Sequence, residues 1–152
     1  MAEAQDRRSR SKQDPVPIAE IRQLWSRAKE ETSGLSDLAD AEKLVSWARM
    51  LGREIDERDL RCPQLKRVMD AIRCLEAAAR KRGLKDPIPE DELAEIVFLR
   101  PLMAYATRRF PRLRLLRRFL DHCFDPAVLK TGDDLVALAK FLESVVAYAY
   151  RS

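Results

Sequence analysis

Apolar residues recur every three or four positions through most of this 152-residue chain, and single prolines and glycines interrupt the pattern. Such spacing puts them on one side of an α-helix, whereas a half-buried strand would need alternation, which no segment shows. The clearest segment starts at Pro63, which suits a first helical position, and stops at Gly83. Its apolar side consists of Leu65, Val68, Met69, Ile72, Leu75 and Ala79. We therefore expect an all-α protein, a compact bundle of five to six helices.

Two helices are expected before this segment. Residues 17–33 show helical spacing up to a stop at Gly34, and the apolar residues are Ile18, Ile21, Leu24, Trp25 and Ala28. A second helix, capped by Ser36 or Asp37, should end near residues 58–61. Its apolar side consists of Ala41, Leu44, Val45, Ala48, Leu51 and Ile55.

Further helices are expected after Gly83. The pattern over residues 90–110 contains Pro101, which cannot donate the helical hydrogen bond, so we expect a kink near residues 97–100. Pro111 can open the next helix. Its apolar face holds Leu113, Leu115, Leu116, Phe119 and Leu120, and its opposite face holds Arg114, Arg117 and Arg118. Thr131 and Asp134 form a capping box for a last helix, so apolar that it should be central or shared with another subunit.

Composition separates a short N-terminal segment from the rest of the chain and indicates where the protein is found. Residues 1–15 offer almost nothing to a core, so we expect a disordered basic tail there and a single domain over residues 16–152. Three unpaired, widely spaced cysteines indicate reduced thiols, and no signal peptide or membrane span is evident. These features favour a cytoplasmic protein without a membrane partner.

The positive charge of the chain is concentrated in one region. The net charge is +4, yet no acidic residue occurs between Glu95 and Asp121, so the rest of the chain is slightly acidic. This region contains Arg100, Arg108, Arg109, Arg112, Arg114, Arg117 and Arg118. A basic row is also expected on the helix after Pro63, where Lys66, Arg73 and Arg80 are spaced by seven residues. A local concentration of positive charge points to a localised anionic partner, and the arginine side chain suits bidentate contacts to phosphate.

Catalytic residues are scarce. His122 is the only histidine, and its neighbour Cys123 would point to a different side of a helix, so we expect a structural or surface role for His122. No spacing suggests a metal site, and the four glycines are too scattered for a phosphate-binding loop. The sequence therefore predicts no enzyme, no metal and no cofactor. Core or interface packing is favoured for Tyr105, Tyr148 and Tyr150. Stacking on a nucleic-acid base stays open as an alternative for one of them.

Four segments, in order, resemble the small α-helical subunit of type III-A, Csm-type CRISPR effector complexes. They are EKLVSWARMLGREI (42–55), LRCPQLKRVMDAIRCLEA (60–77), LAEIVFLRPLMAYATRRF (93–110) and ALAKFLESVVAYAY (137–150). The likeness covers residues 42–148. By position, Gln64 and Lys66 stand where the family has Gln and Arg. Arg100, Pro101, Ala104 and Tyr105 match its K-P-x-L-A-Y segment, and Arg108 or Arg109 its later Arg. Glu143, Val146, Ala147 and Tyr148 match its closing block.

The chain also departs from the family pattern. Cys62 and Pro63 replace a polar pair, Lys66 replaces Arg, and Ser144 replaces Ala. The family's histidine and glycine-rich ending after Tyr148 is missing, so a function of that ending does not carry over. The helix expected over residues 17–33 has no counterpart in the resemblance.

The resemblance implies a non-catalytic subunit in antiviral defence. Several copies would line up on one another beside the backbone and large subunits, along guide (CRISPR) RNA and target RNA. Our candidate RNA-binding residues are Lys66, Arg73, Arg100, Arg108, Arg109, Arg112, Arg114, Arg117 and Arg118. Two alternatives stay open: a helical adaptor whose basic face binds an acidic protein, and, with less support, a DNA-binding regulator. The residues do not distinguish the guide strand from the target strand.

Overall fold

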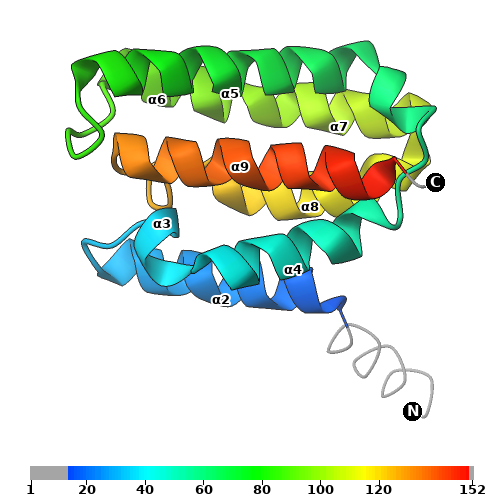
Figure 1. Cartoon of the computed structure of the whole chain (residues 1–152), viewed down its shortest axis with the longest axis horizontal. Coiled ribbons are helices and arrows are strands. Elements are labelled where there is room, and N and C mark those ends of the chain that lie inside the picture. Colours follow the sequence, from blue (N-terminus) through cyan, green and yellow to red (C-terminus); the bar gives the residue numbers. More distant parts are fainter. Residues whose placement is uncertain (1–13, 151–152) are drawn as a thin grey trace, which may run out of the picture.

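The computed structural model describes residues 14–150, which form an all-α bundle (Figure 1). The expected tail over residues 1–15 lies almost entirely outside the described residues. The α-helices are α2 (Val16–Glu30), α3 (Leu35–Leu38), α4 (Ala41–Gly52), α5 (Pro63–Arg82), α6 (Glu90–Val97), α7 (Leu99–Arg109), α8 (Arg114–Cys123) and α9 (Gly132–Ala149). Short 3-10 turns, Asp59–Arg61 and Pro111–Leu113, precede α5 and α8.

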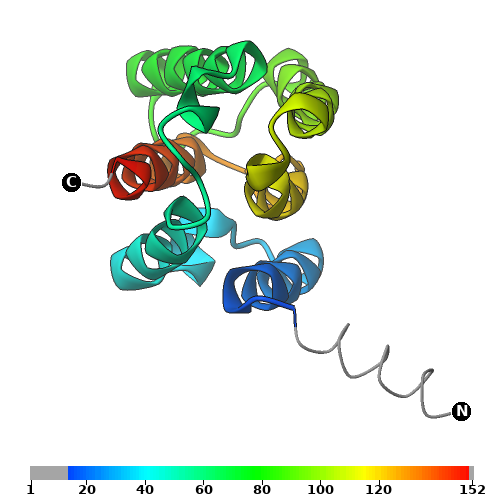
Figure 2. The same ribbon diagram turned by 90° about the vertical axis from the view of Figure 1, so that its right-hand side faces the viewer.

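The helices are arranged in three tiers of two, seen end-on in Figure 2. The outer tiers are α5 beside α6–α7 and α4 beside α2, with the short α3 next to the latter pair. The middle tier pairs α9 with α8, so that α9 packs against both α5 and α4. The apolar last helix is therefore central.

Aromatic side chains join the middle tier to α4. The Phe119 ring of α8 stacks on Phe141 of α9, with 4.6 Å between ring centroids, and meets Trp47 of α4 edge-on at 5.3 Å. All three side chains are almost fully buried. Trp47 satisfies its indole N–H by donating from Nε1 to Oε1 of Glu20 on α2, at 2.8 Å. The core thus extends from α2 through α4 to α8 and α9.

Most of the expected helix limits are confirmed. α5 runs from Pro63 to Arg82, and Gly83 follows with a φ of 132°, a conformation that favours glycine. The expected interruption before Pro101 is a break at Phe98 between α6 and α7. The capping box of Thr131 and Asp134 is present at the start of α9.

Both limits of the second expected helix were wrong. It was expected to end near residues 58–61, but α4 ends at Gly52, and Ile55 lies beyond it. Neither Ser36 nor Asp37 caps it: they belong to the short α3, the chain is extended at Ala39, and Asp40 caps α4 by accepting from Lys43 N at 2.8 Å. This break and the one at Phe98 raise the number of helices above the five to six expected. Val45, assigned to the apolar side, is 38% exposed. None of the helices within residues 14–150 has the length and apolar character needed to cross a bilayer.

Candidate nucleic-acid interface

The nine candidate residues divide into two groups according to their ion-pair partners. Five have a carboxylate nearby within the chain. The pairs are Arg73–Asp70 at 3.6 Å, Arg100–Asp125 at 3.2 Å, Arg112–Asp56 at 3.0 Å, Arg117–Asp121 at 2.9 Å and Arg118–Asp14 at 3.1 Å. The other four are exposed and have no ion-pair partner among residues 14–150: Lys66, Arg108, Arg109 and Arg114. These four cations can accept an external anion without first breaking an ion pair.

Arg100 is the most internally engaged of the nine. It is half-buried at the start of α7, where Nε donates to the carbonyl oxygen of Phe124 at 2.7 Å and Nη2 donates to Oδ2 of Asp125. The same carboxylate oxygen accepts from Nε1 of Trp25 at 3.1 Å. Arg100 therefore joins α7 to the end of α8 and to α2, and few of its donors are left for a ligand.

Arg117 and Arg118 are also held by carboxylates, on the outer side of α8. Hydrogen bonds from Arg118, and secondarily from Arg22, hold the pKa of Asp14 below its usual value, so Asp14 stays charged. Beside Arg117, burial raises the pKa of Asp121, and Arg117 opposes this shift. The N–H of Arg117 faces this carboxylate without the alignment of a hydrogen bond. Both arginines are only partly exposed.

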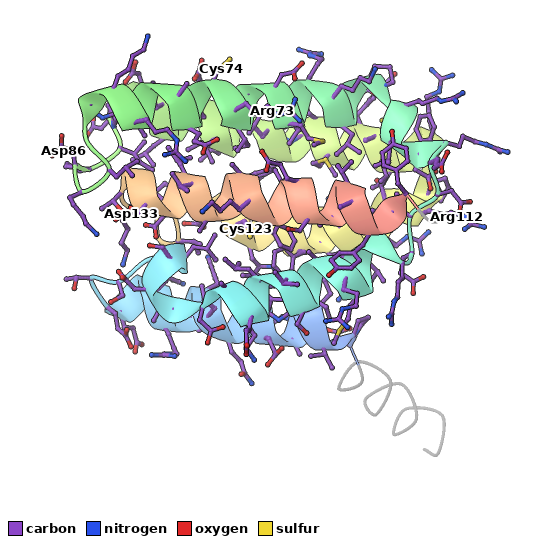
Figure 3. All side chains as sticks on the ribbon, in the orientation of Figure 1. Arg73, Cys74, Asp86, Arg112, Cys123 and Asp133 are labelled. Atoms are coloured by element: carbon purple, nitrogen blue, oxygen red, sulfur yellow. The ribbon has the colours of Figure 1, made fainter. Side chains whose placement is uncertain are left out.

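The four unpaired cations lie at the same end of the bundle. Lys66 is in the first turn of α5, Arg108 and Arg109 are in the last turn of α7, and Arg114 begins α8. α5 and α7 run antiparallel, so these turns are neighbours (Figure 1). Arg112 lies at this end too, opposite the end that holds Asp86 and Asp133 (Figure 3). We call Lys66, Arg108, Arg109, Arg112 and Arg114 the basic end.

Two helices begin at the basic end without an acidic residue in the first turn. Neither α5 nor α8 has a side chain that caps its N-terminus, and both first turns lack Asp and Glu. The helix dipole favours negative charge at both starts, whereas Lys66 and Arg114 add positive charge there. An external phosphate would compensate both the helix dipoles and the cations.

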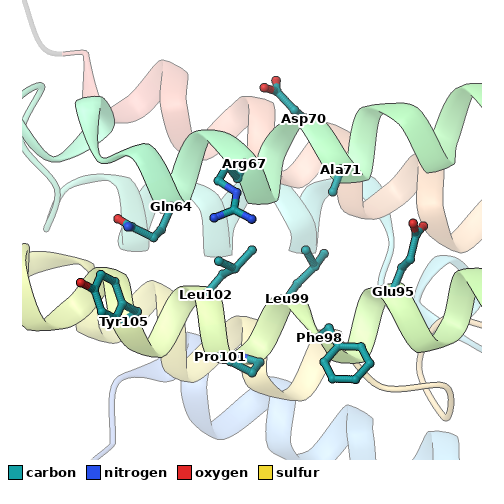
Figure 4. A pocket seen from close by; sticks show the side chains of 10 residues that line it. All are labelled: Gln64, Arg67, Asp70, Ala71, Glu95, Phe98, Leu99, Pro101, Leu102 and Tyr105. Atoms are coloured by element: carbon teal, nitrogen blue, oxygen red, sulfur yellow. The ribbon is translucent and has the colours of Figure 1, made fainter.

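A groove of about 930 Å³ runs between α5 and the break from α6 to α7 (Figure 4). Leu99 and Leu102 point into it from α7, and Gln64 and Arg67 line it from α5. The outer side carries Phe98, which is 72% exposed, and Tyr105, which is 52% exposed. A smaller hollow on the other side of α5 contains Lys66, Arg73 and Tyr150. Each side of α5 therefore combines cations with an exposed aromatic ring.

The groove contains residues that the sequence analysis missed. Neither Arg67 nor Phe98 was a candidate, although the signal for Phe98 is present in the sequence. Phe98, Leu102 and Tyr105 are spaced by four and three residues, a second apolar stripe on this helix besides that of Leu99 and Met103. For Arg67 the sequence contains no comparable signal, because it does not show which of the adjacent cations Lys66 and Arg67 faces the groove.

His122 and Cys123 are packed as structural residues. His122 is half-buried, its ring lies roughly perpendicular to that of Trp25 with 5.7 Å between the ring centroids, and Nδ1 lies 3.1 Å from the carbonyl oxygen of Arg118. Burial raises the pKa of the Cys123 thiol, so the thiolate is disfavoured. Over residues 14–150, no group of three or more histidine, cysteine or carboxylate side chains is placed to hold a metal ion.

A family model described as Csm2 Type III-A matches residues 38–151, which is well over half of the chain. No curated protein and no solved structure matches the chain significantly. The matched range contains all of the basic end and both hollows beside α5, whereas α2 precedes it.

Proposed function

The chain belongs to the Csm2 Type III-A family, and we propose that it is a non-catalytic small subunit that holds the phosphate backbone of RNA at its basic end. The family supplies the place of the protein in the type III-A complex. The observation that supports the RNA contact is the presence of four exposed, unpaired cations on three neighbouring helix ends. Contacts to phosphates would be largely independent of sequence.

The nine candidate residues contribute unequally to RNA binding. Lys66, Arg108, Arg109 and Arg114 make the primary contacts, because no internal ion pair competes for them. Arg112 joins them by exchanging the exposed carboxylate of Asp56 for a phosphate. Arg73, Arg117 and Arg118 contribute secondarily, since each is held by a carboxylate, on the same helix for Arg73 and Arg117 and just before α2 for Arg118. Arg100 acts by positioning α7 against α8.

The partners follow from the family. We propose guide (CRISPR) RNA and target RNA as ligands, and the backbone and large subunits of the cytoplasmic complex as protein partners. Copies of the chain would stand next to one another along the RNA. A few phosphate contacts give a single copy weak affinity, and neighbouring copies raise it through effective concentration. Native mass spectrometry of the purified complex would give the number of copies, and a single copy would contradict the stacking.

RNA binding is tested with the full chain and single-stranded RNA, by fluorescence anisotropy over a range of salt concentrations. We expect the triple variant Arg108→Ala, Arg109→Ala, Arg114→Ala to bind more weakly. Its log-log salt slope should be reduced by about 0.7 for each phosphate that the variant no longer neutralises. The matched control neutralises three cations near the opposite end, Lys29, Lys81 and Lys85, and should keep the salt slope of the unmodified chain.

The outcomes separate the two classes of function. Equal effects of the two triple variants would show a diffuse charge effect and contradict the basic end as the contact. If the unmodified chain binds no RNA but binds an acidic subunit of the complex through Arg108, Arg109 and Arg114, the adaptor function replaces RNA binding.

A further inference from the structure

The groove beside α5 exposes two aromatic rings in a way that the fold does not require. α7 buries Leu99, Met103 and Ala106 against the bundle, so its inner side already supplies the core contacts. Phe98 and Tyr105 lie on another side and remain 72% and 52% exposed. Large exposed apolar side chains that line one hollow mark a binding site more often than they serve stability.

The wall opposite the rings is polar and positive. Arg67 of α5 points across the apolar floor toward Leu99 and Leu102, next to the amide of Gln64 (Figure 4). Arg67 has no ion-pair partner among residues 14–150. Asp70 also borders the groove, but its carboxylate is directed away from the floor and lies 3.6 Å from Nη1 of Arg73. The groove therefore combines two aromatic rings on its outer side with an amide and a guanidinium on the opposite wall.

The groove is continuous with the basic end. Tyr105 is three and four residues before Arg108 and Arg109, which places these arginines one turn further along α7. Gln64 and Tyr105 lie at the same end of the groove, while Glu95 lies at the other (Figure 4). Negative charge is therefore favoured at the Tyr105 end and disfavoured at the Glu95 end.

We propose that this groove binds unpaired bases of the RNA strand whose phosphates contact the basic end, with Phe98 and Tyr105 as stacking surfaces. This inference rests on the proposed function and adds a base contact to it. Ring faces combined with cations along a backbone path are the usual platform for single-stranded nucleic acid. The two rings are about 10 Å apart along α7, from the rise of a helix over seven residues. They would therefore receive different bases.

Bases fit the groove better than an apolar helix of a protein partner. Such a helix would cover the guanidinium of Arg67 without giving it a partner, and an unpaired buried charge is costly. A base can instead stack on a ring with one face while its edge accepts hydrogen bonds from Arg67 and Gln64. The phosphates of the same strand remain in solvent, next to Arg108 and Arg109.

The test compares two strands of equal charge, a short oligouridylate and an abasic RNA of the same length, binding to the full chain. The abasic strand should bind more weakly to the unmodified protein. Phe98→Leu and Tyr105→Leu keep an apolar side chain but remove the ring. Each should weaken oligouridylate binding by roughly fivefold or more, leave abasic binding unchanged, and leave the salt slope unchanged. Tyr105→Phe, which keeps the ring, should bind like the unmodified chain. Tyr148→Leu on α9, a partly exposed ring that does not line the groove, is the aromatic control.

The remaining outcomes overturn the inference in different ways. Equal affinity for the two strands, or leucine variants that bind oligouridylate normally, would remove the base contact while leaving the basic end in place. Normal RNA binding together with failure of the leucine variants to join the complex would assign the groove to a protein partner. Absence of binding to either strand would overturn the proposed function itself along with the groove.

Discussion

The carboxylate of Asp134, at the start of α9, accepts hydrogen bonds from both the backbone N–H and the hydroxyl of Ser36 in α3, at 2.8 Å and 2.7 Å. Its other oxygen accepts from the backbone N–H of Lys130 at 2.8 Å and of Thr131 at 3.1 Å. The side chain is almost fully buried. One carboxylate therefore holds together two segments that are 98 residues apart in the sequence.

Asp134→Ala should lower the free energy of unfolding by about 3 kcal/mol, because it leaves buried N–H groups without acceptors. Urea denaturation followed by circular dichroism measures the loss. Asp133→Ala is the control on the neighbouring residue, since it removes only the ion pair with exposed Lys85 and should cost less than about 1 kcal/mol. Equal losses in the two variants would contradict the role given to Asp134.

Arg100→Ala should reduce stability by about 1 to 3 kcal/mol, because the carbonyl of Phe124 and the carboxylate of Asp125 both lose a donor. Arg109→Ala should change stability by less than about 0.5 kcal/mol, as expected for an exposed side chain without internal bonds. RNA binding should show the reverse order, with a smaller salt slope for Arg109→Ala only. If Arg100→Ala reduced the slope and left the urea midpoint unchanged, Arg100 would be a direct contact.

Protonation of Glu20 should make the protein less stable in acid. Hydrogen bonds from Lys43, chiefly, and from Trp47 hold the pKa of its carboxyl below the ordinary value of 4.5. A pKa lowered in the folded state contributes stability above pH 4.5, and this contribution is lost as the pH falls through the lower folded value. Glu20→Gln should therefore lose less stability than the unmodified chain between pH 6 and pH 3, measured as the shift in urea midpoint. Glu42→Gln, at an exposed site on α4, should follow the unmodified chain.

Gly52→Ala should destabilise the contact between α4 and α9. A Cβ atom at Gly52 would lie 2.8 Å from Cβ of Tyr148 and 2.9 Å from the carbonyl oxygen of Val145, so α4 would have to move. Such overpacking typically costs about 1 to 3 kcal/mol. Thermal unfolding measures the change. A rise in melting temperature, as for a glycine in an open helix, would show that α9 can accommodate the methyl group.

Local signals in the sequence were enough to predict the helices whose ends depend on nearby residues. Pro63, Gly83 and Pro101 act through their own backbone, so their effects did not depend on tertiary contacts. The start of α4 was missed because Ser36 gives its N–H and hydroxyl to Asp134, a partner that local pattern cannot reveal. A choice between Ser36, Asp37 and Asp40 as the cap needs that contact.

The candidate site was predictable as a set of charges but not as a surface. The sequence identified seven arginines in one region, yet it could not show that Arg118 meets Asp14 or that Arg100 faces Phe124. It also could not join Lys66 to Arg108 and Arg109, because that proximity comes from the antiparallel packing of α5 and α7. Spacing along one helix predicted the faces, and packing between helices decided which cations remain unpaired.

The placement of unpaired cations at one end gives the molecule a permanent electric moment along its long axis. At the opposite end, some of the cations are compensated in pairs, such as Arg82 with Glu92 at 3.0 Å and Lys85 with Asp133 at 2.7 Å. The field of an extended polyanion therefore exerts a torque on the bundle, which turns the basic end toward the strand before contact. Salt shortens the range of this torque to about 8 Å at physiological ionic strength. The association rate should consequently fall with added salt, because fewer encounters begin in the right orientation.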